Sequence, residues 1–296
     1  MKKIIAIIVA ISIQSTLVFC QTEQTNFTVL KGPYLGQKPP GNIPELFAPG
    51  IISREGYFEH SAAIFSPDGN EVYWSGKPQG ARYFEINFMK MVNGRWTEPK
   101  IAFSHNGYNF GNPVFSSDGN KLFFDSRGDI WFVERKSDGW TEPVQVSSLI
   151  NSEGSETLRS ITKDGSIYFS RYNANASSEG RMHEVYVSRK INGNYTDPEK
   201  LGKSINSDDV KEFGVFVAPD ESYIIIQEAK GNISSELIII YKITDGSWSN
   251  RIKLNVGWAQ FPSVSPDGKY LFFMTRDGIA WRDSSFIEEL KSTELK

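Results

Sequence analysis

Four residues whose types could carry chemistry stand near the starts of predicted strands: His60, Glu156, Arg159 and Glu212. Glu156 and Glu212 occupy matching positions in neighbouring repeats and could form a carboxylate pair, the minimum equipment for glycoside hydrolysis. His60 could act as a general base, with Arg159 or Tyr168 assisting. The structural alternative is that the glutamates pair with nearby cations or backbone amides and that His60 is hydrogen-bonded within the fold.

A basic residue recurs just after the second strand of each repeat: Lys77, Arg127, Arg171, Lys230 and Arg276. Five cations on one rim would suit an anionic ligand such as a uronate or a sulfated glycan, because arginine binds such groups through two parallel hydrogen bonds. The alternative is that these side chains bond carbonyls of the next sheet. Asn112, which stands near a strand start like His60, is a further candidate for ligand binding.

The sequence offers no pattern for a metal or a cofactor. His105 and His183 fall in predicted loops without ligand spacing, so no metal site is predicted, although calcium in a central channel stays open. Cys20 is the only cysteine, which leaves no intramolecular disulfide, cysteine-ligated zinc or cysteine nucleophile.

The elements that must position the candidates are organised around a turn that occurs five times. Its first copy is Ser66-Pro67-Asp68-Gly69, where Pro presets the first φ, Asp bonds its own backbone and Gly takes a positive φ. The turn aspartates are Asp68, Asp118, Asp164, Asp220 and Asp267. They stand about 50 residues apart, the period expected for four-stranded propeller blades.

The two ends of the repeat array complement each other. Residues 44–48 resemble an outer strand with no blade before it, whereas the last repeat lacks an outer strand and ends in a short predicted helix at 285–291. Joining the ends removes two open sheet edges. We therefore predict an all-β fold over residues 44–296, a five-bladed β-propeller of four-stranded antiparallel blades closed by an N-terminal strand, with six blades as the alternative.

The first residues predict export. Lys2 and Lys3 precede an apolar run, and small residues stand before Gln21, so residues 1–20 are expected to be a signal peptide. Cleavage after Cys20 is favoured over lipidation of Cys20, because Phe19 is large. The protein is expected in the periplasm or outside the cell, attached to a membrane only if Cys20 is lipidated. Residues 21–43, rich in Pro and Gly, are expected to be an extended segment.

The composition of the chain argues against some classes of binding partner. The 296 residues carry a net charge of −3, which favours neither nucleic acid nor an anionic membrane. At 39% hydrophobic residues the chain can bury a sizeable core, and a repeat running almost end to end argues for one domain after the extended segment.

The Ser-Pro-Asp-Gly turn followed by an aromatic strand resembles the WD-repeat-like repeats of TolB, the periplasmic propeller of the Tol system, and of many secreted Bacteroidetes proteins. The resemblance covers about residues 44–283 and implies the propeller fold. Similar repeats occur in protein-binding modules, in propellers of prolyl-oligopeptidase-type peptidases and in some polysaccharide lyases, so they imply no single function. The sequence lacks TolB's separate N-terminal α/β domain, and it lacks the hydrolase domain and Gly-x-Ser-x-Gly elbow of the peptidases.

The leading interpretation is a binding or scaffold module that recognises a protein or an anionic glycan at the channel mouth. Counting back from each turn aspartate aligns five strand starts that should ring this mouth: 59–62, 109–112, 155–158, 211–214 and 258–261. The alternative is a carbohydrate-active enzyme, a lyase or hydrolase acting on an acidic polysaccharide. Convergence of His60, Glu156, Arg159 and Glu212 on one pocket would favour the enzyme, and side chains bonded into the blades would favour the binding module.

Overall fold

The computed structural model describes residues 27–103, 109–172, 183–207, 211–230 and 234–295, with the backbone alone at 211–213 and 230. The chain is nearly all β, with 48% strand and 5% helix. The predicted signal peptide, Cys20 and His105 lie outside the described residues. In the described part of the chain, no helix has the length and apolar character needed to span a membrane.

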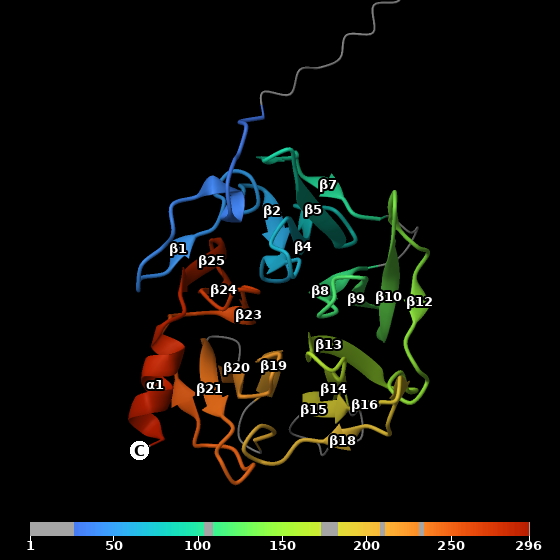
Figure 1. Cartoon of the computed structure of the whole chain (residues 1–296), viewed down its shortest axis with the longest axis vertical. Helices are drawn as coiled ribbons and strands as arrows, with labels where there is room; N and C mark the ends of the chain where they lie inside the picture. Colours follow the sequence, from blue (N-terminus) through green and yellow to red (C-terminus); the bar gives the residue numbers. More distant parts are fainter. Residues whose placement is uncertain (1–26, 104–108, 173–182, 208–210, 231–233, 296) are drawn as a thin grey trace, which may run out of the picture.

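Five antiparallel sheets stand around a central axis as the blades of a propeller (Figure 1). Blade 1 contains β2 (Tyr57–Glu59), β3 (Ile64–Phe65), β4 (Glu71–Pro78), β5 (Glu85–Val92), β6 (Arg95–Trp96) and β7 (Lys100–Ile101). Blade 2 contains β8 (Gly111–Phe115), β9 (Lys121–Ser126), β10 (Asp129–Lys136), β11 (Gly139–Trp140) and β12 (Val144–Gln145). Blade 3 contains β13 (Ser155–Ile161), β14 (Ile167–Tyr172), β15 (His183–Ser188), β16 (Lys190–Ile191), β17 (Asn194–Tyr195) and β18 (Glu199–Lys200). Blade 4 contains β19 (Lys211–Val217), β20 (Tyr223–Lys230), β21 (Ser234–Tyr241) and β22 (Ile252–Lys253).

Blade 5 takes its outer strand from the other end of the chain. Its strands β23 (Gln260–Val264), β24 (Tyr270–Thr275) and β25 (Gly278–Asp283) precede helix α1 (Phe286–Glu294), and β1 (Glu45–Leu46) pairs antiparallel with β25. The buried Phe47 follows β1 and packs its ring 5.1 Å from those of Phe272 and Trp281. The predicted five-bladed ring and its closure by an N-terminal strand are confirmed, and the alternative of six blades is wrong.

The hairpin turn between inner and second strand is held by short-range hydrogen bonds. Ser66 Oγ donates to Asp68 Oδ1 over 2.6 Å, and the same oxygen accepts the Asn70 backbone N–H over 3.0 Å. Gly69 lies at φ +71°, which glycine adopts without steric cost. Blade 2 repeats these distances at Ser116 and Asp118. The turns are therefore locally determined and nearly identical.

The turn of blade 4 departs from this pattern. Glu221 replaces the glycine, and it lies at φ +60°. Its carboxylate accepts a hydrogen bond from Tyr168 of blade 3 over 2.7 Å and forms an ion pair with Arg189. Glu221 thus adopts an unfavourable backbone conformation, and its side chain links blade 4 to blade 3.

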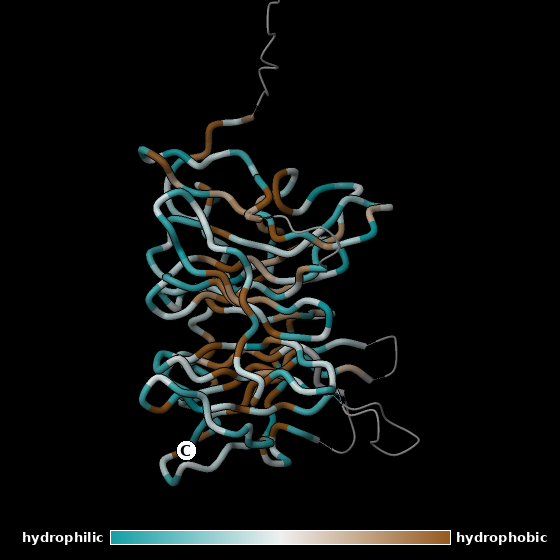
Figure 2. The backbone as a smooth tube through the Cα atoms, turned by 90° about the vertical axis from the view of Figure 1, so that its right-hand side faces the viewer, coloured by the Kyte–Doolittle hydropathy of each residue, from teal (hydrophilic) through white to brown (hydrophobic). Residues whose placement is uncertain are grey.

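The apolar core lies between the blades. Buried residues form five clusters, each shared by two neighbouring blades. Figure 2 shows hydrophobic segments of the chain, in brown, in the interior of the molecule. Trp74 and Trp281, for example, belong to the cluster between blades 1 and 5, and Tyr73 and Phe124 to the cluster between blades 1 and 2. Blade-to-blade packing therefore provides the hydrophobic stabilisation that fixes the inner strands around the axis.

Residues 27–43 lie against blades 1 and 5. Tyr34, in the short 3-10 helix η1 (Tyr34–Gly36), donates to Asp267 over 2.7 Å, and its ring centroid lies 4.8 Å from that of Tyr270. Trp96 Nε1 donates to Gly32 O over 2.8 Å. The segment therefore reinforces the closure of the ring.

Candidate functional site

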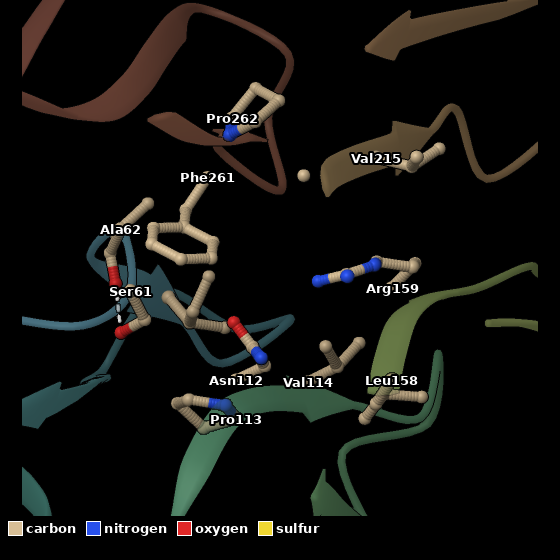
Figure 3. A pocket seen from close by; sticks show the side chains of 12 residues that line it. Ser61, Ala62, Asn112, Pro113, Val114, Leu158, Arg159, Val215, Phe261 and Pro262 are labelled. Atoms are coloured by element: carbon tan, nitrogen blue, oxygen red, sulfur yellow. Dashed lines mark hydrogen bonds between the residues drawn. The ribbon is translucent and has the colours of Figure 1, made fainter. Parts of the chain in front are cut away.

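The inner strands of blades 2 to 5 each contain a β-bulge. Register shifts fall between Gly111 and Val114, Leu158 and Ser160, Glu212 and Val215, and Gln260 and Ser263. A bulge breaks the in-and-out alternation of side chains. Residues from these intervals, namely Asn112, Arg159, Gly214 and Phe261, meet Ser61 and Ala62 of blade 1 at the channel waist (Figure 3). The waist encloses about 30 Å³, space for little more than a water molecule.

A larger cavity of about 490 Å³, the mouth cavity, opens at the end where the inner strands begin. Its walls carry His60, Asn112, Asp125, Thr157, Arg159, His183, Gln227, Ser234, Ser235, Trp258, Gln260 and Phe261. All five blades contribute to this wall. The volume lies within the range of small-molecule sites.

Arg159 of β13 borders both the mouth cavity and the waist. Its Nε donates to Ser170 Oγ over 2.8 Å, the one hydrogen bond that the side chain makes within the described chain. Figure 3 shows the guanidinium reaching across the waist towards the Phe261 ring and the Asn112 amide. Burial lowers the pKa of Arg159 to about 10, against the opposing charge of Asp125, so the side chain is a cation at neutral pH.

Asp125 of β9 is the carboxylate of this cavity. Asn112 Nδ2 donates to Asp125 Oδ1 over 2.7 Å. Burial raises the pKa of Asp125 to about 6, although the Asn112 bond and the Arg159 charge oppose the rise. A Cβ on Gly111 would lie 2.6 Å from the carboxylate, so glycine makes room for the side chain. The site therefore combines a cation with a carboxyl group that titrates just below neutral pH.

His60 follows β2 and lies between two aromatic rings. Its ring centroid is 4.6 Å from that of Phe84 and 5.1 Å from that of Phe261. The Nδ1 atom is buried and finds no hydrogen-bond partner among the described residues. Burial, together with the charges of Arg159 and Lys77, lowers the pKa of His60 to about 4, so the imidazole is neutral at physiological pH.

Glu156 is placed differently. Its side chain is buried in blade 3, where Oε1 accepts hydrogen bonds from Ser152 Oγ over 2.5 Å and from Arg171 Nε over 2.8 Å. Arg171 stands directly opposite Glu156 across β13 and β14. Both residues are thus bonded to each other, and neither lines the mouth cavity.

The other predicted cations whose side chains the structure describes do not line the mouth cavity. Lys77 Nζ lies 4.7 Å from the Phe84 ring centroid, and Arg276 Cζ lies 5.4 Å from that of Trp258. Arg127 is exposed in the turn after β9. The side chains of Glu212 and Lys230 lie outside the described residues. Of the ten predicted site residues, the mouth cavity therefore brings together His60, Asn112 and Arg159.

The sequence prediction missed Asp125 and Gln227, whereas Phe261 lies in the predicted strand start 258–261. A signal for Asp125 was present, because a carboxylate at the end of the apolar run Leu122-Phe123-Phe124 is unusual for a buried strand. Among the described residues, no group of three or more His, Cys, Asp or Glu side chains could hold a metal ion.

No protein-family model matches the sequence, and no curated protein matches it. Solved structures similar in fold include TolB from Acinetobacter baumannii, 16% identical with a TM-score of 0.48 over 76% of this chain and 53% of that chain. The putative TolB from Agrobacterium tumefaciens is 17% identical, with a TM-score of 0.48 over 73% of this chain and 69% of that chain. This chain thus spans about half the length of the Acinetobacter protein.

A chain in the crystal structure of the nidogen/laminin complex is 12% identical, with a TM-score of 0.51 over 78% of either chain. At such low identity the likeness shows the fold alone. The chain is a five-bladed β-propeller whose structural neighbours include TolB-type propellers.

Proposed function

We propose that this propeller is a binding module that recognises a glycan at the mouth cavity. The observation that carries the proposal is the composition of the cavity wall, where flat apolar surfaces alternate with polar side chains. Trp258 and Phe261 contribute aromatic rings to the wall, while Asn112, Gln227 and Gln260 contribute amide groups. Aromatic faces and amides are suited to the apolar and hydroxyl surfaces of a sugar ring.

Several polar groups of the wall are already held in place. Asn112 is bonded to Asp125, and Gln227 Oε1 accepts the Phe261 backbone N–H over 3.3 Å. Fixed partners reduce the ordering that a ligand must impose, which favours binding.

The arrangement gives less support to catalysis. A glycosidase needs two carboxylates flanking one bond, and Glu156 is occupied by Ser152 and Arg171 in blade 3. His60 has a pKa of about 4, too low for an efficient general base at neutral pH.

The N-terminal sequence supports a further part of the proposal, that the protein works outside the cytoplasm. We propose an exported propeller of the type secreted by Bacteroidetes, released by cleavage after Cys20. N-terminal sequencing of the mature protein, expressed with its leader in a Gram-negative host, should start at Gln21. A mature protein that starts at a lipidated Cys20 would contradict this part.

The test of the glycan proposal is chromatography of purified protein over immobilised neutral, uronic-acid and sulfated polysaccharides. In parallel, the soluble forms are incubated with the protein and unsaturated or shortened products are followed by absorbance and reducing ends. We expect retention on at least one glycan without product. Product formation would establish an enzyme instead, and no retention on any glycan would overturn the proposal in favour of a protein partner.

A further inference from the structure

We infer that the channel waist is a carboxylate subsite, in which the Nη groups of Arg159 receive the acid group of a uronic-acid unit seated in the mouth cavity. The inference rests on the proposed function and names the class of glycan. Its starting point is the hydrogen bonding of Arg159: Nε donates to Ser170 Oγ, and the guanidinium points into the waist (Figure 3).

The geometry of arginine suits a carboxylate. The guanidinium is planar, and its donors match the two oxygens of a carboxylate through parallel hydrogen bonds. In the described part of the chain Arg159 forms no ion pair, although Asp125 is near enough to influence it. A buried cation without a direct partner is costly, and a bound anion would relieve that cost.

The small size of the waist limits which part of a sugar can enter it. The space there is about 30 Å³, whereas the mouth cavity holds about 490 Å³. A sugar ring fits the mouth cavity but not the waist, so only a substituent of the ring can enter the waist, where the Arg159 guanidinium lies. A carboxylate is such a small substituent, and on entering the waist it would displace the water that this space can hold.

Asp125 adds a condition to this recognition. Its carboxylate lies close to the Arg159 charge and would repel a bound acid when ionised. The ionisable groups around it are Arg159, His60 and His183 in the cavity wall, and the charge of Lys77 acts on His60. Loss of the proton from Asp125 is therefore expected to weaken the binding of a uronate as pH rises through 6.

The experiment is isothermal titration calorimetry at pH 5.5 with three probes: digalacturonate, its dimethyl ester and a sulfated lactose. The proteins are the wild type, Arg159→Gln, Arg159→Lys and the control Arg95→Gln, which removes an exposed cation that does not line the mouth cavity. Thermal melts of each variant establish folding, and Arg159→Lys keeps the buried charge in case Arg159→Gln does not fold.

We expect the wild type to bind digalacturonate about tenfold or more tightly than the ester, since a hydrogen bond to a charged group is worth this much. Arg159→Gln should abolish that preference, Arg159→Lys should keep part of it, and Arg95→Gln should change it less than about twofold. Tighter binding of the sulfated lactose than of digalacturonate would show that the subsite recognises a sulfate and not a carboxylate, which would overturn the inference.

The outcomes separate the subsite from the proposed function. Equal binding of acid and ester, or a preference that survives in Arg159→Gln, overturns the subsite and leaves glycan binding intact. Absence of binding to all three probes, together with no retention on any polysaccharide, overturns both.

Discussion

The two ends of the channel are built from the same repeats but shift the pKa values of their carboxyl groups in opposite directions. At the turn end, hydrogen bonds from Ser116 and Asn120 lower the pKa of Asp118. At Asp68 partial burial opposes the same effect, yet the hydrogen bonds from Ser66 and Asn70 still lower its pKa. At the mouth, burial raises the pKa of Asp125 to about 6.

The difference teaches which part of a repeat protein is structural and which part is free to change. The turn carboxylates form hydrogen bonds that close a hairpin, and their repetition is explained by the fold. The residues that line the waist differ from blade to blade: blades 1 to 5 contribute Ala62, Asn112, Arg159, Gly214 and Phe261. Function in this molecule is therefore expected where the repeat varies.

Weakening the closure of the ring should cause the largest loss of stability, because both ends of the channel depend on a closed ring. Phe47→Ala removes a fully buried ring between blades 1 and 5 and should lower the free energy of unfolding by about 3–5 kcal/mol. Urea denaturation measures the change. Leu46→Ala, at a neighbouring side chain with 37% exposure, is the control and should cost less than about 1 kcal/mol. Equal losses would contradict the role of Phe47 in closure.

The pH dependence of stability should have opposite signs at the two ends. Asp125 has a folded pKa of about 6, above the unfolded value of about 3.9, so the folded state binds more protons between these values. Its contribution to stability is therefore present at pH 4 and is lost as pH rises through 6, with a slope of at most about 1.4 kcal/mol per pH unit.

Asp125→Asn tests this sign, since the amide keeps the shape of the side chain without its charge. The stability of wild type relative to the variant should fall between pH 4 and pH 7 in urea denaturation. A wild type that gains on the variant as pH rises would show that Asp125 is stabilised as an anion, contrary to our account.

A turn aspartate should behave in the reverse manner and with a smaller effect. Asp118→Ala removes the acceptor for Ser116 and Asn120 and should cost about 1 kcal/mol at pH 7. The folded pKa is lowered, so this contribution is present above the unfolded value and is lost as pH falls through the folded pKa. Glycan affinity should stay within about twofold of wild type, whereas a larger loss would contradict the separation of the two ends.

The fold was predictable because its determinants are local and repeated. Each turn is closed by side chains within a few positions of Asp68 or its equivalents, so the sequence shows them directly. Closure by β1 followed from counting strands, since one end of the array had an outer strand too many and the other had one too few.

The site was predictable only in part because bulges and cross-strand pairs decide it. His60, Asn112 and Arg159 follow from alignment with the turns, and the structure brings them to one cavity. The orientation of Glu156 depends on Arg171, its neighbour across the sheet, whereas the sequence pattern groups Arg171 with the other rim cations. Asp125 reaches the cavity because Gly111 leaves space opposite it, a relation between two strands that spacing alone does not reveal.

The most direct test of the central claim, that the variable end of the channel holds the ligand, is a crystal structure of the protein soaked with digalacturonate. We predict density for a sugar ring beside Trp258 and Phe261 in the mouth cavity, with its carboxylate within about 3 Å of the Arg159 Nη atoms. Density at the turn end, or a sugar in the mouth with its acid group pointing away from Arg159, would contradict the account.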